Sequence, residues 1–164
     1  MAIDATDDRA DDGAFIHDGG DTRKHFADLN SGNVCGNRPK FTTNLARRVG
    51  LPTESRNPQR AEDIKAYLRD EMAPLLKGMG FSVSIESRDG RVPPFLIAER
   101  FESADATTVL GYGHGDVVDG MDKAWQPGLS PWTMTESNGR LYGRGTADNK
   151  GQHTINLAAM KAVL

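Results

Sequence analysis

One segment in the C-terminal half constrains this chain most, because polar side chains follow each of two short strands predicted in it. The first predicted strand, Thr107–Leu110, is apolar enough to be buried and runs into a glycine-rich stretch with His114 and Asp116. The second, Arg140–Tyr142, is followed by two glycines and Asp148 just before a helical run. Polar side chains on glycine-bearing loops at strand ends are where α/β folds usually place their chemistry.

Composition narrows the class of protein. The 164 residues are 37% hydrophobic and 26% charged, with a formal net charge of −3, which is typical of a globular domain with a real core. No basic patch predicts a nucleic-acid partner, and no apolar run approaches the roughly 20 residues of a membrane span. The single cysteine, Cys35, allows no internal disulfide, and the N-terminus has no apolar signal core. We expect a cytoplasmic protein.

The two ends of the chain differ in character. Residues 1–40 are rich in aspartate and glycine, bury little apolar surface and are predicted to be a mobile segment. The calcium-loop spacing fails there, at Ala10 or at Ile16 according to the glycine chosen. Residues 41–164 are predicted to form a single domain. The last helix stops on Leu164 without a capping signal, so we expect the first part of a longer protein.

Hydrophobic periodicity predicts helices separated by strands, which indicates an α/β fold with a mixed sheet flanked by helices. The helix that begins near Pro58 should be kinked or interrupted at Pro74 and end at Gly78 or Gly80. Its apolar stripe is predicted to be core: Ile64, Tyr67, Leu68, Met72, Leu75 and Leu76. The remaining predicted elements are helices over 41–49 and 152–164, strands over 81–85 and 94–101, and a turn at Asp89–Gly90.

His114 and Asp116 are the first candidates for chemistry. In an extended segment, residues two apart project to the same side, so the carboxylate can accept the proton of one imidazole nitrogen. Such a partner fixes the tautomer and raises the basicity of a zinc-bound histidine. On this motif alone, a histidine held by an ordinary surface carboxylate is the favoured interpretation.

Asp148 lies at a predicted helix start, where free N–H groups favour an anion. An N-cap role is an equally good interpretation. Lys150 is interpreted either as a solvated charge or as a partner of a nearby carboxylate. The P-loop, dinucleotide-binding and serine-hydrolase spacings are all absent from the sequence.

Together, GHGDVV, two tryptophans and LYGRGTADNKGQ resemble the dinuclear zinc metallopeptidase-20 family, which includes acetylornithine deacetylase, succinyl-diaminopimelate desuccinylase, aminoacylase and carboxypeptidase G. The resemblance covers about residues 41–164 and implies that they form a truncated metallohydrolase catalytic domain. It implies that His114 ligates one metal ion, that Asp148 bridges two, and that Asp116 orients the His114 ring and counts as catalytic. It also implies a cis peptide between Asp148 and Asn149. The implied cofactor is Zn²⁺, two ions per complete site, with Co²⁺ or Mn²⁺ as alternatives.

The resemblance also implies parts that this chain lacks. Family members place a Glu-Glu pair, a further aspartate and a histidine beyond this helix, and they carry a separate lid and dimerisation domain. We therefore expect half a site and an inactive isolated chain, from a full-length homodimer that hydrolyses a small peptide or an N-acylated amino acid. A non-catalytic binding module and an incomplete gene product are the alternatives. Trp125 and Trp132 are interpreted as local packing rather than as lining of the site.

Overall fold

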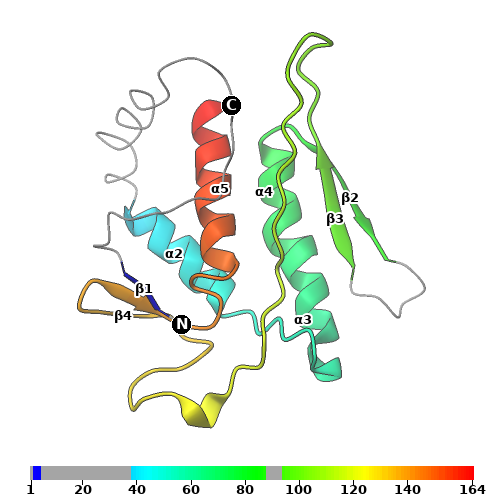
Figure 1. The fold of residues 1–164 in the computed structure, drawn as a ribbon. Coiled ribbons are helices and arrows are strands. Elements are labelled where there is room, and N and C mark those ends of the chain that lie inside the picture. The colour runs from blue at the N-terminus through cyan, green and yellow to red at the C-terminus, as the bar shows by residue number, and fades with distance from the viewer. Residues whose placement is uncertain (1, 5–37, 88–93) are drawn as a thin grey trace.

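The computed structural model describes residues 2–4, 38–87 and 94–164 (Figure 1). The predicted turn at Asp89–Gly90 and most of the predicted mobile segment lie outside these residues. Helices and short strands alternate along the described chain, so the predicted α/β class is confirmed. The helical elements are α2 (Arg38–Val49), η2 (Pro58–Arg60), α3 (Ala61–Ala66), η3 (Tyr67–Met72), α4 (Ala73–Gly78), η4 (Asp122–Ala124) and α5 (Lys150–Val163). No helix of the described part is long and apolar enough to cross a membrane.

The strands of the described residues form two small antiparallel sheets. One has the order β1–β5–β4, from Ala2–Asp4, Arg140–Tyr142 and Thr135–Ser137. The other pairs β2 (Ser82–Glu86) with β3 (Phe95–Glu99). The parallel component is a single bridge between Glu54 and Val117, outside the named strands. This bridge ties the loop after α2 to the loop that carries the candidate site.

The long helical run from Pro58 to Gly78 contains the predicted interruption. Pro74 lacks an N–H group, and its ring crowds the carbonyl four residues earlier, so a regular α-helix cannot continue through it unchanged. The structure places a π-helical stretch, η3, directly before Ala73, and Pro74 lies in the first turn of α4. The helix ends at Gly78, and Gly80 takes the left-handed φ of 84° that glycine tolerates.

Two apolar clusters form the core. The first joins the long helical run to α5 through Tyr67, Met72, Leu76 and Leu157. The second joins α2 to β5 through Leu45, Val49 and Leu141. The predicted apolar stripe is confirmed, because four of its members are buried and the other two, Leu68 and Leu75, pack against the first cluster.

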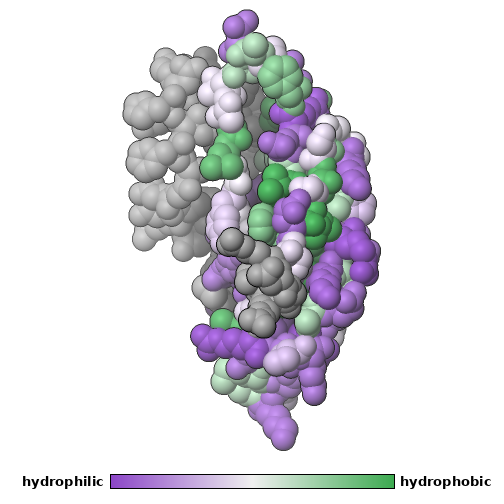
Figure 2. All heavy atoms as spheres, turned by 90° about the vertical axis from the view of Figure 1, so that its right-hand side faces the viewer, coloured by the Kyte–Doolittle hydropathy of each residue, from purple (hydrophilic) through white to green (hydrophobic). Residues whose placement is uncertain are grey.

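The β2–β3 hairpin buries only one of its faces in the described structure. Leu96 and Ala98 pack against the first cluster, whereas Phe95 and Ile97, which alternate with them along β3, are exposed. Figure 2 views the molecule from this side and shows apolar residues gathered in the middle of the face among polar ones. Apolar side chains therefore lie on both sides of β3, which is the pattern of a strand that can be covered on two faces.

The predicted strand Thr107–Leu110 is wrong. No ladder includes these residues, and the side chains of Val109 and Leu110 are 81% and 94% exposed. An apolar run shows that a segment can pair, but a strand exists only where a neighbour supplies hydrogen bonds. Among the described residues, no strand lies beside Thr107–Leu110. The chain reaches the candidate site as irregular structure.

Candidate metal centre

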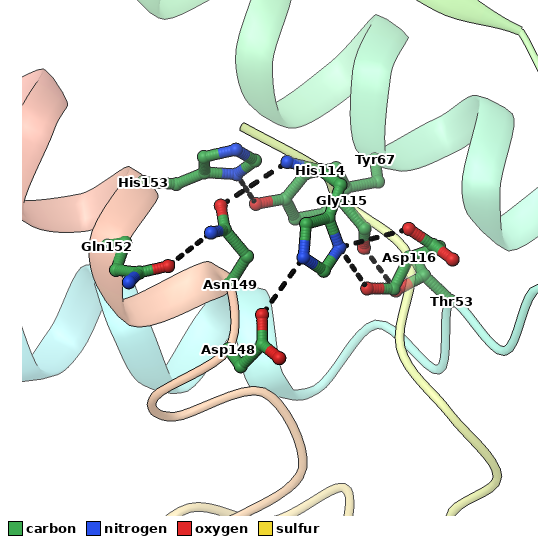
Figure 3. Close-up of polar contacts among 9 residues, drawn as sticks. All are labelled: Thr53, Tyr67, His114, Gly115, Asp116, Asp148, Asn149, Gln152 and His153. Atoms are coloured by element: carbon green, nitrogen blue, oxygen red, sulfur yellow. Dashed lines mark hydrogen bonds and ion pairs between the residues drawn. The ribbon is translucent and has the colours of Figure 1, made fainter. Parts of the chain in front are cut away.

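His114 contacts both carboxylates that the sequence singles out (Figure 3). Its Nδ1 lies 3.1 Å from Asp116 Oδ1 and 3.1 Å from the Asp116 carbonyl oxygen, and its Nε2 lies 2.9 Å from Asp148 Oδ1. The predicted cooperation of His114 with Asp116 is present even though the segment is not a strand. A histidine held at one nitrogen offers the other in a fixed direction. Here that direction is towards Asp148.

Asp148 is not the N-cap of α5, so the second interpretation of this residue is wrong. The helix begins at Lys150 and its cap position is Asn149, without a side-chain capping bond. The Asp148 side chain is instead 66% exposed and turned towards His114. The peptide between Asp148 and Asn149 is cis, as the family resemblance implies. Asp148 is thus available as a ligand.

The electrostatics of His114 reflect its two acidic neighbours. Burial lowers the pKa of its imidazole, but hydrogen bonds with the Asp116 backbone and the Asp148 carboxylate, together with both negative charges, raise the pKa overall. The site therefore favours a positive charge between Asp116 and Asp148. A proton can supply that charge, and so can a metal cation.

A pocket opens at these residues, and its lining includes His114, Asp116, Asp148 and Arg144. Neither tryptophan lines it. Trp125 donates from Nε1 to the Gly120 carbonyl at 2.7 Å, and a Cβ at Gly120 would lie 2.5 Å from Trp132 Cζ2. The interpretation of the tryptophans as local packing is confirmed.

Lys150 fits neither of its predicted roles. It is fully buried, its Nζ donates to the Leu51 carbonyl at 2.5 Å, and it lies 5.6 Å from the centroid of the Tyr67 ring. Burial lowers its pKa to about 7. Lys150 therefore anchors the start of α5, two residues after Asp148, to the start of the loop that follows α2.

The two candidate ligands, His114 and Asp148, are of types that zinc binds, but they are fewer than a zinc site needs. Imidazole nitrogen and carboxylate oxygen are zinc ligands, and two atoms bound to one tetrahedral ion are about 3.3 Å apart for bonds of about 2.0–2.1 Å. The separation of 2.9 Å between His114 Nε2 and Asp148 Oδ1 is close to this. In the described part of the chain, however, no group of three or more His, Cys, Asp or Glu side chains could hold a metal ion.

Several supporting residues were not predicted from the sequence. Asn149 Oδ1 accepts the His114 amide at 3.3 Å, and Thr53 Oγ1 donates to the Gly115 carbonyl at 2.6 Å. Tyr67 was predicted only as core, and no role was predicted for His153. Asn149 directly follows Asp148 in the sequence, and this position was a signal that it lies near the site. Nothing in the sequence pattern indicated Thr53.

Comparison with known proteins finds similar sequences and similar structures. The model of peptidase family M20/M25/M40 matches residues 110–164, which contain both motifs. The fold resembles the crystal structure of human carnosine dipeptidase 1, with a TM-score of 0.69 and 26% identity over 84% of this chain and 29% of that one. It also resembles the structure of the dipeptidase Dug1p from Saccharomyces cerevisiae, with a TM-score of 0.66 and 20% identity over 78% and 29% of the two chains.

Among curated proteins, the Beta-Ala-His dipeptidase of Mus musculus is 32% identical over 139 residues. The match covers 77% of this chain and 26% of the relative, so the chain spans about a quarter of the relative's length. The predicted resemblance to the metallopeptidase-20 family is confirmed over the part of the chain that these matches cover.

Proposed function

We propose that this chain forms the N-terminal part of a zinc-dependent hydrolase that cleaves the amide or peptide bond of a small substrate, with a dipeptide as the first choice. One observation carries the proposal: His114 Nε2 faces Asp148 Oδ1 at 2.9 Å while Asp116 engages the other ring nitrogen. The names of the relatives, a Beta-Ala-His dipeptidase and a carnosine dipeptidase, favour the dipeptide.

The residues take distinct roles in this proposal. His114 and Asp148 would hold the metal, and Asp116 keeps the His114 imidazole in the tautomer whose Nε2 is free to bind. A bound zinc ion activates water and polarises a carbonyl group. Arg144 lines the same pocket and supplies a permanent positive charge beside it.

The isolated chain is proposed to be inactive. Hydrolysis with a metal-activated water needs a general base within hydrogen-bond reach of that water. Asp116 is already engaged with His114, and the residues that line the pocket include no glutamate. Two ligands are also fewer than the three or four protein ligands usual for zinc.

Two experiments test the proposal. Calorimetry of this chain with zinc at neutral pH should show weak binding or none, and two tightly bound ions would contradict the half-site argument. In a longer protein that contains this segment, Asp148→Ala should reduce zinc-dependent dipeptide hydrolysis to background. Zinc-dependent hydrolysis that survives the substitution would refute the role of Asp148.

A non-catalytic binding module is the second candidate, favoured by the shortage of ligands in the described residues. The two candidates differ in the longer protein. A module binds a dipeptide and leaves it intact, with or without zinc, whereas the hydrolase releases free amino acids. Mass spectrometry of the incubated dipeptide separates them.

A further inference from the structure

A buried pair of aromatic rings lies directly behind the His114 loop. Tyr67, from η3, and His153, from α5, are 1% and 9% exposed. The Tyr67 hydroxyl lies 2.8 Å from His153 Nδ1, and the ring centroids are 6.0 Å apart with an interplanar angle of 27°. Neither residue contacts solvent substantially or belongs to the proposed ligand set. The pair joins two helices immediately beside the site (Figure 3).

The two glycines that flank His114 lie against this pair. A Cβ at Gly113 would lie 2.0 Å from His153 Nε2, and a Cβ at Gly115 would lie 2.5 Å from two carbons of the Tyr67 ring. Neither glycine has a positive φ, so the backbone conformation does not require glycine at either position. Glycine is required at both positions because the backbone lies so close to the two rings. The peptide on each side of His114 therefore lies directly on one member of the pair.

Protonation gives the pair one hydrogen-bond direction. Burial raises the pKa of the Tyr67 hydroxyl, which stays protonated and donates. Burial lowers the pKa of His153 to about 4, and the neighbouring charge of Arg48 lowers it too, so the ring is neutral at pH 7 and Nδ1 accepts. A backbone hydrogen bond with Gly113 opposes this shift, which places Gly113 within reach of the His153 ring.

We propose that Tyr67 and His153 are positioning residues for His114, a buried platform on which the flanking glycines rest so that the imidazole meets Asp148 and Asp116. The metal-binding purpose of this arrangement rests on the proposed function. α5 links the two parts: it carries His153, and Asp148 lies two residues before its first residue, Lys150. Thr53 holds the other side of the loop through the Gly115 carbonyl. Removing the platform should therefore loosen His114 while α2 stays folded.

Hydrogen exchange of backbone amides in metal-free protein tests this directly. Tyr67→Phe removes only the hydroxyl, and Leu76→Val is a matched control in the same core cluster. Exchange at His114 and Val117 should rise about tenfold relative to Val49 in α2 with Tyr67→Phe, the factor expected for one ordinary hydrogen bond. Leu76→Val should move all three amides together. An unchanged ratio in Tyr67→Phe would overturn the proposal.

A double-mutant cycle tests the contact at Gly113. Gly113→Ala should accelerate exchange at His114 when His153 is present, and it should do so several-fold less in a His153→Ala background, where the obstructing ring is gone. Additive effects would overturn the proposal. If His153→Ala does not fold, the hydrogen-exchange comparison of Tyr67→Phe with Leu76→Val still tests the proposal.

The ring nitrogens of His114 provide a spectroscopic signature. Their ¹⁵N shifts report the tautomer of the neutral ring and should indicate a single tautomer in the unmodified protein and averaging of two tautomers in Tyr67→Phe; unchanged shifts count against positioning. None of these measurements uses metal or substrate. Zinc-dependent hydrolysis that survives Asp148→Ala would therefore contradict the proposed function and leave the platform intact.

Discussion

Two groups of polar residues in this molecule each pair a carboxylate with a basic side chain. One group is largely buried, and the other lies at the surface. The arginine–glutamate cluster consists of Arg47, Arg48, Glu71 and Thr154. Glu71 accepts hydrogen bonds from both arginines at 2.7–3.0 Å, and Arg48 donates to Thr154 at 2.6 Å. In the candidate metal centre, His114 and Asp148 are paired with each other, but Asp148 is mostly exposed and a pocket opens at both.

The two groups differ in what their charges do: one group stabilises the fold, and the other is suited to attract a cation. The cluster connects α2, η3 and α5, and its carboxylate is satisfied by partners within the chain, as buried polar groups generally are. The centre concentrates negative charge beside a histidine at the surface, which is a poor way to stabilise a fold and a good way to attract a cation. Substitutions in the two groups should therefore affect different measurements.

The largest effect on stability is expected for Glu71→Ala. The substitution leaves Arg48 buried without its carboxylate, which should lower the free energy of unfolding by about 3–5 kcal/mol. Urea denaturation followed by circular dichroism measures the loss. Glu62→Ala, at an exposed ion pair, is the matched control and should cost less than about 1 kcal/mol. Equal losses would show that burial does not distinguish the pairs.

Lys150→Met should have the next largest effect. Methionine keeps most of the volume but leaves the Leu51 carbonyl without its donor, which should cost about 1–3 kcal/mol. Because burial lowers the pKa of Lys150 to about 7, only part of the molecules carry its charge at neutral pH, and the loss should come mainly from the hydrogen bond. Thermal unfolding of Lys150→Met beside Lys161→Met, in the last turn of α5, measures it. A stabilised Lys150→Met variant would contradict this account.

Acid should weaken the cluster in a specific pH range. Burial alone would raise the pKa of Glu71, but hydrogen bonds from Arg47 and the charge of Arg48 lower it overall. A folded-state pKa below the unfolded value of about 4.5 means that the stabilisation is complete above that pH and is lost as the pH falls through the folded value. Glu71→Gln should flatten this part of the profile of unfolding free energy against pH. An unchanged profile would assign acid unfolding to other carboxyl groups.

The smallest effect on stability is expected at the metal centre. Asp148→Asn should change the free energy of unfolding by less than about 1 kcal/mol, because the residue is exposed and loses only an open ion pair. In a longer protein that contains this segment, the proposed function predicts that the same variant loses metal-dependent activity. Parallel denaturation and activity assays check the contrast, and a large loss of stability would make Asp148 a structural residue instead.

Much of the site was predictable from sequence, for local reasons. The spacing of His114 and Asp116 is enough to bring the side chains together even in irregular chain, since only one residue separates them. The glycines before Asp148 and the helical run after it indicated a turn at a helix start. The meeting of His114 with Asp148, 34 residues apart, was implied by the family resemblance and not by any periodicity.

The failures have a common physical cause. Thr107–Leu110 has the composition of a strand, but no described segment pairs with it. Lys150 has the side chain of a surface residue, yet it is buried over the Tyr67 ring. Lys150 meets partners that are distant in the sequence, and Thr107–Leu110 has no strand partner among the described residues, so the local pattern could reveal neither outcome.

The amino-acid sequence by itself determined the helices, the α/β class and the type of chemistry, because helical period, turn residues and ligand types are local properties of the chain. Only the tertiary structure decided which polar residues are buried and which face the pocket. His153 shows why: its neutral state and its place behind Gly113 depend on desolvation between two helices, which arises only when the chain has packed.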